Sequence, residues 1–224
     1  MKTAIDHIVI GAATLEQGAE YIKRILGVDM PFGGEHLTMG THNLLIPLGE
    51  NIFLEVIAIN PDIPSPSQPR WYGLDDPYVR KCLAIEPALL TWVVNTGNIR
   101  TLMKGAGVSF GKPELISRDN LSWYFGLPGD GRLLAGGLLP YLIEWQTEAH
   151  PANSMKDSGC RLHQMRIFHT NVSWLESKLT SIDASHCVEI NSLNENSAAF
   201  MIAEIETPYG IKELRSIAAE SQAI

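Results

Sequence analysis

The sequence has few cysteines, and no motif pairs them. Only Cys82, Cys160 and Cys187 occur among 224 residues, with no CxxC pair. An odd, widely spaced set argues against a disulfide framework and against a cysteine-ligated zinc site. We therefore expect inert thiols and a cytoplasmic protein.

Long apolar runs and concentrated positive charge are also missing. No stretch of about 18 uncharged apolar residues occurs, and no apolar targeting run precedes the first strand-like pattern. The formal net charge is −8, and no dense block of lysine and arginine is present to displace counterions from a nucleic acid or an anionic lipid. We expect a small-molecule ligand and no nucleic-acid or membrane partner.

The motifs of several common enzyme classes are absent as well. Glycine pairs at 33–34 and 129–131 lack the spacing of a phosphate loop or a dinucleotide fingerprint. There is neither a GxSxG elbow nor an HExxH helix. These absences leave nucleotide-binding, serine hydrolase and zincin functions without their usual residues.

The first sixty residues predict a strand, a helix and three more strands. Thr14 is a candidate N-cap and Gly27 a stop for the helix, whose apolar residues recur at helical spacing. The predicted strands are bounded by glycine-containing turns and cover 5–10, 35–39, 42–48 and 52–59. This order is β-α-β-β-β.

The same order recurs further along the chain. After a proline-rich stretch, a strand at 89–94 and a helix at 98–104 precede strands at 121–125 and 138–145, with 109–117 ambiguous. The order recurs a third time, less completely, with a strand at 162–168, a helix at 172–182, and strands near 198–206 and 211–216. We predict an α+β fold of paired βαβββ modules forming a curved mixed-sheet cup, with a partial third unit. The predicted segments are 1–60, a linker at 61–82, a second module at 83–148 and a partial module at 149–224.

Two glutamates interrupt apolar strands at similar places in the two modules. Glu55 lies within Phe53-Leu54-Glu55-Val56-Ile57 and Glu144 within Tyr141-Leu142-Ile143-Glu144-Trp145. A buried carboxylate is costly without a compensating cation, donor or proton. The repeat therefore favours a shared site, and the alternative is that each glutamate faces solvent.

His7 joins these glutamates as a candidate site residue. Strand alternation predicts that His7 faces one side of the sheet and Asp6 the other. The turn at Gly40 would bring Thr41, His42 and Asn43 to the rim of a pocket. His36 and His42 are candidates for its wall, and so is Trp92, which stands at the place in the second module that matches His7.

Four segments resemble the vicinal oxygen chelate superfamily, and more closely a glyoxalase-like branch of it. They are Asp6-His7-Ile8-Val9-Ile10, Gly40-Thr41-His42-Asn43, Leu54-Glu55-Val56-Ile57 and Pro140-Tyr141-Leu142-Ile143-Glu144-Trp145. The resemblance spans about residues 4–147 and implies metal ligation by His7, Glu55 and Glu144. The fourth ligand position falls on Trp92, which cannot bind a metal.

The resemblance implies a small-molecule enzyme, a lyase or isomerase acting on neighbouring oxygens with a divalent metal such as Mn, Fe, Ni, Mg or Zn. Glu144 would then also be available as the catalytic group that moves a proton. One alternative is a metal-free binding protein of the bleomycin-resistance type, and another is an extradiol-type dioxygenase. Superfamily relatives also suggest a homodimer.

Overall fold

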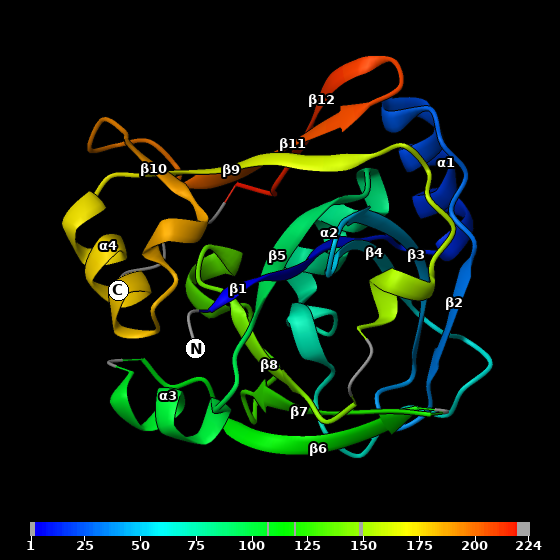
Figure 1. Ribbon diagram of the computed structural model, residues 1–224, viewed down its shortest axis with the longest axis horizontal. Helices are drawn as coiled ribbons and strands as arrows, with labels where there is room; N and C mark the ends of the chain where they lie inside the picture. The colour runs from blue at the N-terminus through cyan, green and yellow to red at the C-terminus, as the bar shows by residue number, and fades with distance from the viewer. Residues whose placement is uncertain (1–2, 107, 119, 148–149, 219–224) are drawn as a thin grey trace.

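Two βαβββ units share one curled sheet of eight strands, and a third unit adds a separate sheet of four (Figure 1). This computed structural model describes residues 3–106, 108–118, 120–147 and 150–218. The strand order of the large sheet is β2-β3-β4-β1-β5-β8-β7-β6. The predicted α+β class and curved mixed sheet are confirmed.

The first unit follows the predicted order closely. It consists of β1 (Ala4–Gly11), α1 (Leu15–Leu26), β2 (Phe32–His36), β3 (Thr41–Gly49) and β4 (Ile52–Ile59). Helix α1 begins where the Thr14 side chain accepts a hydrogen bond from the Gln17 amide, and it ends at Gly27, whose φ of 77° is left-handed. Strands β1 and β4 pair in parallel, as the helical crossover between them requires.

The second unit repeats this plan and joins the first through its opening strand. It contains β5 (Ala88–Asn95), α3 (Ile99–Gly105), β6 (Lys112–Arg118), β7 (Leu121–Leu127) and β8 (Tyr141–Trp145). Strand β5 pairs in parallel with β8 and antiparallel with β1. Between the units lies α2 (Pro77–Ile85), a helix that the sequence analysis did not place. The ambiguous stretch 109–117 largely becomes edge strand β6.

The third unit has the element order of the first two but a different strand pairing. It contains β9 (Arg161–His169), α4 (Val172–Ser181), β10 (Glu189–Ser192), β11 (Phe200–Thr207) and β12 (Gly210–Arg215). Strand β9 lies between β10 and β11, whereas β1 and β5 each pair with the last strand of their unit. An isolated bridge between Leu89 and Ser216 ties this unit to β5. In Figure 1 its sheet crosses one side of the large sheet.

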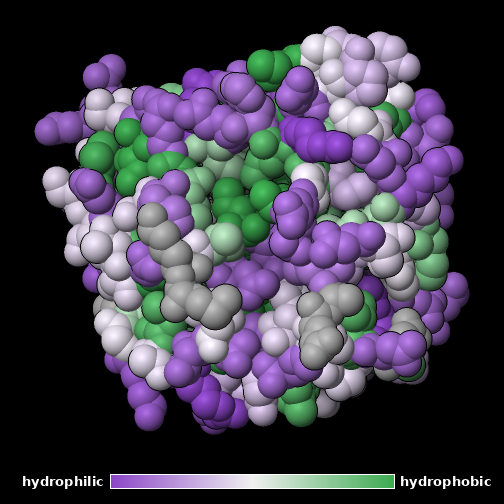
Figure 2. Space-filling model, viewed as in Figure 1, coloured by the Kyte–Doolittle hydropathy of each residue, from purple (hydrophilic) through white to green (hydrophobic). Residues whose placement is uncertain are grey.

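The surface is mostly hydrophilic on the face drawn in Figure 2, with apolar residues gathered near the centre, below β9. None of the helices within the described ranges is long and apolar enough to cross a membrane. The predicted boundary between residues 148 and 149 falls outside the described residues.

The large sheet curls until its two edge strands meet. Arg118, at the end of β6, lies 3.2 Å from the His36 ring at the end of β2, measured between Nη1 and Nε2. A Cβ atom added to Gly34 of β2 would lie 3.0 Å from the same guanidinium. The concave face of the sheet is therefore nearly enclosed, and its side chains converge.

The loop between β4 and α2 is fixed by a close backbone approach. The Gly73 amide donates to the Gly131 carbonyl over 2.8 Å. Gly131 has a φ of 66°, and a Cβ atom there would lie 2.0 Å from the Arg70 carbonyl oxygen. Only glycine fits at this position, and its neighbour Gly129 has no atom within 4 Å of an added Cβ.

We expect Gly131→Ala to lower the free energy of unfolding by about 2 kcal/mol or more, because it strains φ and collides with backbone. Gly129→Ala, in the same loop, should change it by less than about 0.5 kcal/mol. Urea unfolding of both variants measures the difference. Equal stabilities would contradict the close approach.

Candidate functional site

A small cavity lies on the concave face, with a volume of about 40 Å³. That space holds about one or two water molecules. Its polar lining residues are His7, His36, Asn43, Glu55 and Arg118. Its aromatic lining residues are Phe53, Trp71, Tyr72, Trp123, Phe125 and Trp145. A wider groove of about 790 Å³ runs beside residues 62–68 but contains none of these groups.

A β-bulge in β1 brings two consecutive side chains to the cavity side. Ile5 pairs with Val94 and His7 pairs with Val93, which leaves Asp6 as the extra residue without a partner in β5. The Asp6 carboxylate then accepts a hydrogen bond from Nδ1 of His7 over 2.6 Å. The prediction that Asp6 and His7 face opposite sides was wrong, because alternation fails at a bulge.

Asp6 is completely buried and accepts hydrogen bonds from three nitrogen donors. Besides His7, these are Nε1 of Trp145 at 2.7 Å and Nε2 of His150 at 3.1 Å. Burial by itself would raise the pKa of Asp6, but the hydrogen bonds from His150 and His7 outweigh it and hold the pKa at about 2. Asp6 is therefore a fixed negative charge behind His7.

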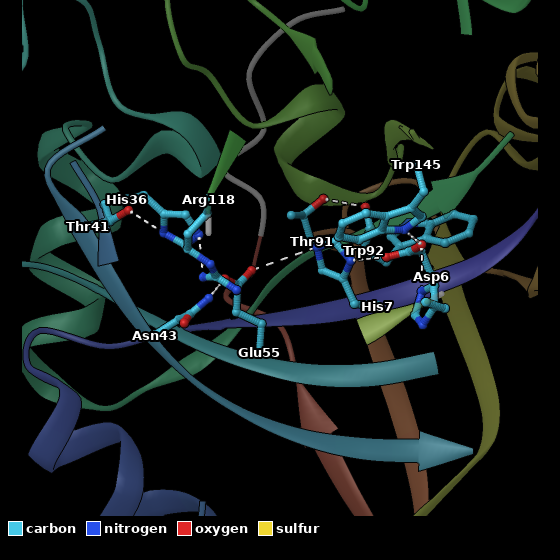
Figure 3. A network of polar contacts seen from close by, with 11 residues as sticks. Asp6, His7, His36, Thr41, Asn43, Glu55, Thr91, Trp92, Arg118 and Trp145 are labelled. Atoms are coloured by element: carbon cyan, nitrogen blue, oxygen red, sulfur yellow. Dashed lines mark hydrogen bonds and ion pairs between the residues drawn. The ribbon is translucent and has the colours of Figure 1, made fainter. Parts of the chain in front are cut away.

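His7 and Glu55 face each other across the cavity (Figure 3). Nε2 of His7 lies 3.8 Å from Oε2 of Glu55, and both side chains are buried. The other carboxylate oxygen of Glu55 accepts a hydrogen bond from Nδ2 of Asn43 over 2.6 Å. With Nδ1 of His7 donating to Asp6, a neutral His7 presents its Nε2 lone pair to the cavity.

His36 and Arg118 form the opposite side of the cavity. Nδ1 of His36 is 3.2 Å from the Thr41 hydroxyl, and Nε2 faces the Arg118 guanidinium. Burial, and then the positive charge of Arg118, lower the pKa of His36 to about 3. His36 is therefore neutral near pH 7, with Nε2 accepting from Arg118 and Nδ1 donating to Thr41.

The loop before α2 supplies Trp71 and Tyr72 to the cavity. Tyr72 is buried and has a φ of 58°, which is unusual for an aromatic residue and marks a strained position held by its surroundings. Burial and then the charge of Glu55 raise the pKa of the Tyr72 hydroxyl well above its usual range. The hydroxyl therefore stays protonated and can donate a hydrogen bond.

Glu144 does not join His7 and Glu55. Its Oε2 accepts a hydrogen bond from the Ile99 amide over 2.7 Å, at the first residue of α3. In strand pairing, Val93 and Ile143 hold the places that His7 and Glu55 hold in the first unit. The sequence match was one residue off, and in a strand a shift of one residue moves a side chain to the other face.

Trp92 lies one residue before the matching place, Val93, and therefore also misses the cavity. It pairs with Ile8, is completely buried, and donates from Nε1 to the Leu138 carbonyl over 3.0 Å. It does not line the cavity. The prediction that Trp92 forms the wall of a binding site was therefore wrong, and it is a core residue.

The predicted rim residues divide by alternation along β3. Asn43 lines the cavity, and Thr41 lies behind it as the partner of His36. His42, between them, faces the other side of the sheet and is not in the lining, so its predicted role is not supported. Burial lowers the pKa of His42, partly offset by the nearby charge of Glu16 on α1.

Sequence reasoning missed Asp6, Tyr72, Arg118 and His150. Asp6 precedes a candidate ligand directly, which was a usable signal. Tyr72 lies in a stretch interpreted as a linker, and Arg118 lies in an ambiguous one. No local pattern marks these two, because the folding of distant segments brings them to the cavity.

The residues present do not fit the implied three-ligand metal site. Of the three implied ligands, His7 and Glu55 line the cavity and Glu144 does not. No group of three or more His, Cys, Asp or Glu within the described ranges has the arrangement of a metal site. The Glu144 carboxylate instead binds the first amide of α3. The Arg118 guanidinium lines the cavity of His7 and Glu55, and its positive charge disfavours a metal cation there. The two-histidine, one-carboxylate set of a ring-cleaving dioxygenase is not formed either.

The depressed pKa of His36 predicts a specific loss of stability in acid. In the unfolded chain His36 binds a proton below about pH 6.5. In the folded chain it binds one only near pH 3. The free energy of unfolding should fall by about 2 kcal/mol more in the wild type than in His36→Gln between pH 6.5 and 5. Urea unfolding across this range tests it, and parallel pH curves would contradict it.

Glu144 should matter for helix α3 and not for the cavity. Replacing it by alanine removes the acceptor for the Ile99 amide and should lower the free energy of unfolding by about 1 kcal/mol. Asn98→Ala, which removes the N-cap acceptor of the Thr101 amide, should cost a similar amount. A Glu144→Ala variant as stable as the wild type would show that this contact contributes nothing.

Three solved structures show what this chain is similar to, and of these the first, with a TM-score above 0.5, supports the fold. A hypothetical protein from Staphylococcus aureus is 14% identical with a TM-score of 0.58, over 98% of this chain and 87% of that one. A variant of 4-hydroxymandelate synthase from Streptomyces coelicolor is 12% identical with a TM-score of 0.46, over 99% of this chain and 65% of that one. Methylmalonyl-CoA epimerase from Mycobacterium tuberculosis is 20% identical with a TM-score of 0.38, over 63% of this chain and 87% of that one.

The family assignment comes from the sequence. No curated protein matches the chain. The model of the family described as a glyoxalase-like domain matches residues 5–182, well over half of the chain. The protein therefore belongs to the glyoxalase-like domain family.

Proposed function

We propose that the protein is an isomerase or lyase that moves a proton at a carbon next to a carbonyl group of a small molecule. The observation that carries this proposal is the buried His7–Glu55 pair with Asp6 behind it. Two carboxylates and an imidazole are costly to bury. They are also the groups that general acid–base catalysis requires.

The geometry supports a division of roles between the two groups. Oε2 of Glu55 faces the cavity, while its other oxygen is held by Asn43. Glu55 would accept the proton that leaves the carbon, and Nε2 of His7, oriented by Asp6, would take the proton of a neighbouring hydroxyl group and later return it. One proton leaves and one is delivered, so an isomerisation balances without an oxidant or reductant.

The electrons released on the substrate need stabilising at the carbonyl oxygen. The Tyr72 hydroxyl is kept protonated by burial and by Glu55, and it lines the same cavity. A hydrogen bond from Tyr72 and the positive charge of Arg118 would stabilise an enolate oxygen. Both groups are in place before the charge develops, which is what makes such stabilisation effective.

Substrate entry requires the cavity to widen. A volume of about 40 Å³ is smaller than any organic substrate. Pro151 lines the cavity, and Ala152 packs with Leu45 and Phe53 in a small apolar cluster separate from the main core. We propose that this segment, Pro151–Ser154, moves when the ligand enters.

A binding protein without catalysis is the second candidate. Six aromatic side chains line the cavity, which favours a flat or apolar ligand. Both functions predict ligand binding, but only the enzyme needs the Glu55 carboxylate to exchange protons with a bound molecule. The two are therefore separated by substituting Glu55 while binding and turnover are followed independently.

We expect the wild type to catalyse exchange of carbon-bound hydrogen for deuterium in D₂O, measured by proton NMR on a panel of 2-hydroxy carbonyl compounds and 2-oxo acids. Glu55→Gln should slow exchange at least about 100-fold, because it removes the base. Glu144→Gln makes the same chemical change outside the cavity and should leave the rate unchanged. Exchange that survives Glu55→Gln would reject Glu55 as the base, and the absence of exchange in every compound would favour the binding protein.

A further inference from the structure

We infer that Arg118 binds a carboxylate group of the ligand, so that the substrate is a small organic acid. The inference rests on the proposed function for the position of the reacting carbon, but the binding claim can be tested without any turnover. It deepens the proposal by naming the substrate class.

Arg118 is half-buried and, among the described residues, has no acidic partner of the kind that a comparable arginine has. Arg70 is also largely buried, and its Nη1 lies 2.6 Å from the carboxylate of Asp75. No carboxylate within the described ranges lies within ion-pair distance of Arg118, and its hydrogen bond is to the His36 ring. The guanidinium therefore keeps most of its donors and its charge available to a ligand.

His36 positions Arg118 without neutralising it. The ring is buried against Trp71, with ring centroids 4.8 Å apart at nearly a right angle. Its Nδ1 bonds to the Thr41 hydroxyl, so Nε2 is the acceptor that faces the guanidinium. A carboxylate in this place would hold Arg118 equally well but would cancel its charge.

The anchor and the reacting pair line the same small cavity, so one small molecule bound there would contact both. Figure 3 shows the guanidinium of Arg118 reaching from β6 toward His36 and the Asn43–Glu55 pair. A carboxylate held there would bring the first two carbons beyond it toward Glu55. In a 2-hydroxy acid the proton to be removed is on C2, and in a 2-oxo acid it is on C3, next to the carbonyl carbon, so both classes of acid suit the site.

A second buried donor also calls for an acceptor on the ligand. Nε1 of Trp71 is buried and has no hydrogen-bond partner among the described residues, although Trp71 lines the cavity. Buried indole N–H groups usually have a partner. An oxygen-rich ligand could satisfy this donor together with Arg118, whereas a purely apolar ligand could not.

The competing explanation is that Arg118 only joins the two edges of the curled sheet. If Arg118 had only this structural role, its substitution would change stability, but the protein would not bind a carboxylate more tightly than an amide of the same shape. The decisive comparison is therefore between an acid and its uncharged isostere, made on wild type and variant.

The experiment titrates pyruvate and lactate, and their amides pyruvamide and lactamide, into the protein by calorimetry. The fluorescence of the cavity tryptophans Trp71, Trp123 and Trp145 reports local binding. The wild type should bind at least one acid more tightly than its amide. Arg118→Gln should weaken acid binding about 10- to 100-fold and remove this preference. Arg100→Gln, on exposed α3, changes the charge equally and should have no effect.

Several results would overturn the inference. They are equal binding of acid and amide by the wild type, unchanged acid binding by Arg118→Gln, and no binding of either acid. Inorganic phosphate that competes as well as the acids would reject a carboxylate-specific site. Glu55→Gln should keep acid binding while losing hydrogen exchange, so a failure of the proposed chemistry is distinguished from a failure of the anchor.

Discussion

The buried carboxylate of Asp6 is the interaction on which the cavity depends. It accepts hydrogen bonds from His7 on its own strand, from Trp145 on β8, and from His150 beyond it. One charged group therefore orients a cavity histidine, ties the second unit to the first, and anchors the segment that covers the concave face. Three donors make the burial of this charge tolerable, and loss of any one leaves the charge less well compensated.

The two βαβββ units contribute unequally to the site. The first supplies the polar groups His7, Asn43 and Glu55, while the matching places in the second unit hold Val93 and Ile143. A symmetric cup with ligands from both halves would favour a metal. Here the second unit instead provides aromatic walls and one guanidinium, an arrangement better suited to holding an organic anion beside an acid–base pair.

The third unit shows how far element order constrains pairing. The chain repeats the order β-α-β-β-β, yet β9 takes a central place between β10 and β11 instead of pairing with the last strand. Order along the chain follows from local patterns of apolar residues and turns. Pairing depends on which edges remain free once the unit packs on the larger sheet, and no local pattern encodes that.

The sequence by itself determined the paired units, the helices α1 and α3, and the placement of His7 and Glu55 within strands, because periodicity and caps are local. It also marked His36 and Asn43 as cavity residues. It misplaced Glu144 and Trp92, since a one-residue difference in register reverses the face of a strand. Only the tertiary structure decided that a bulge turns Asp6 inward and that Arg118 meets His36, because both depend on contacts between segments far apart in the chain.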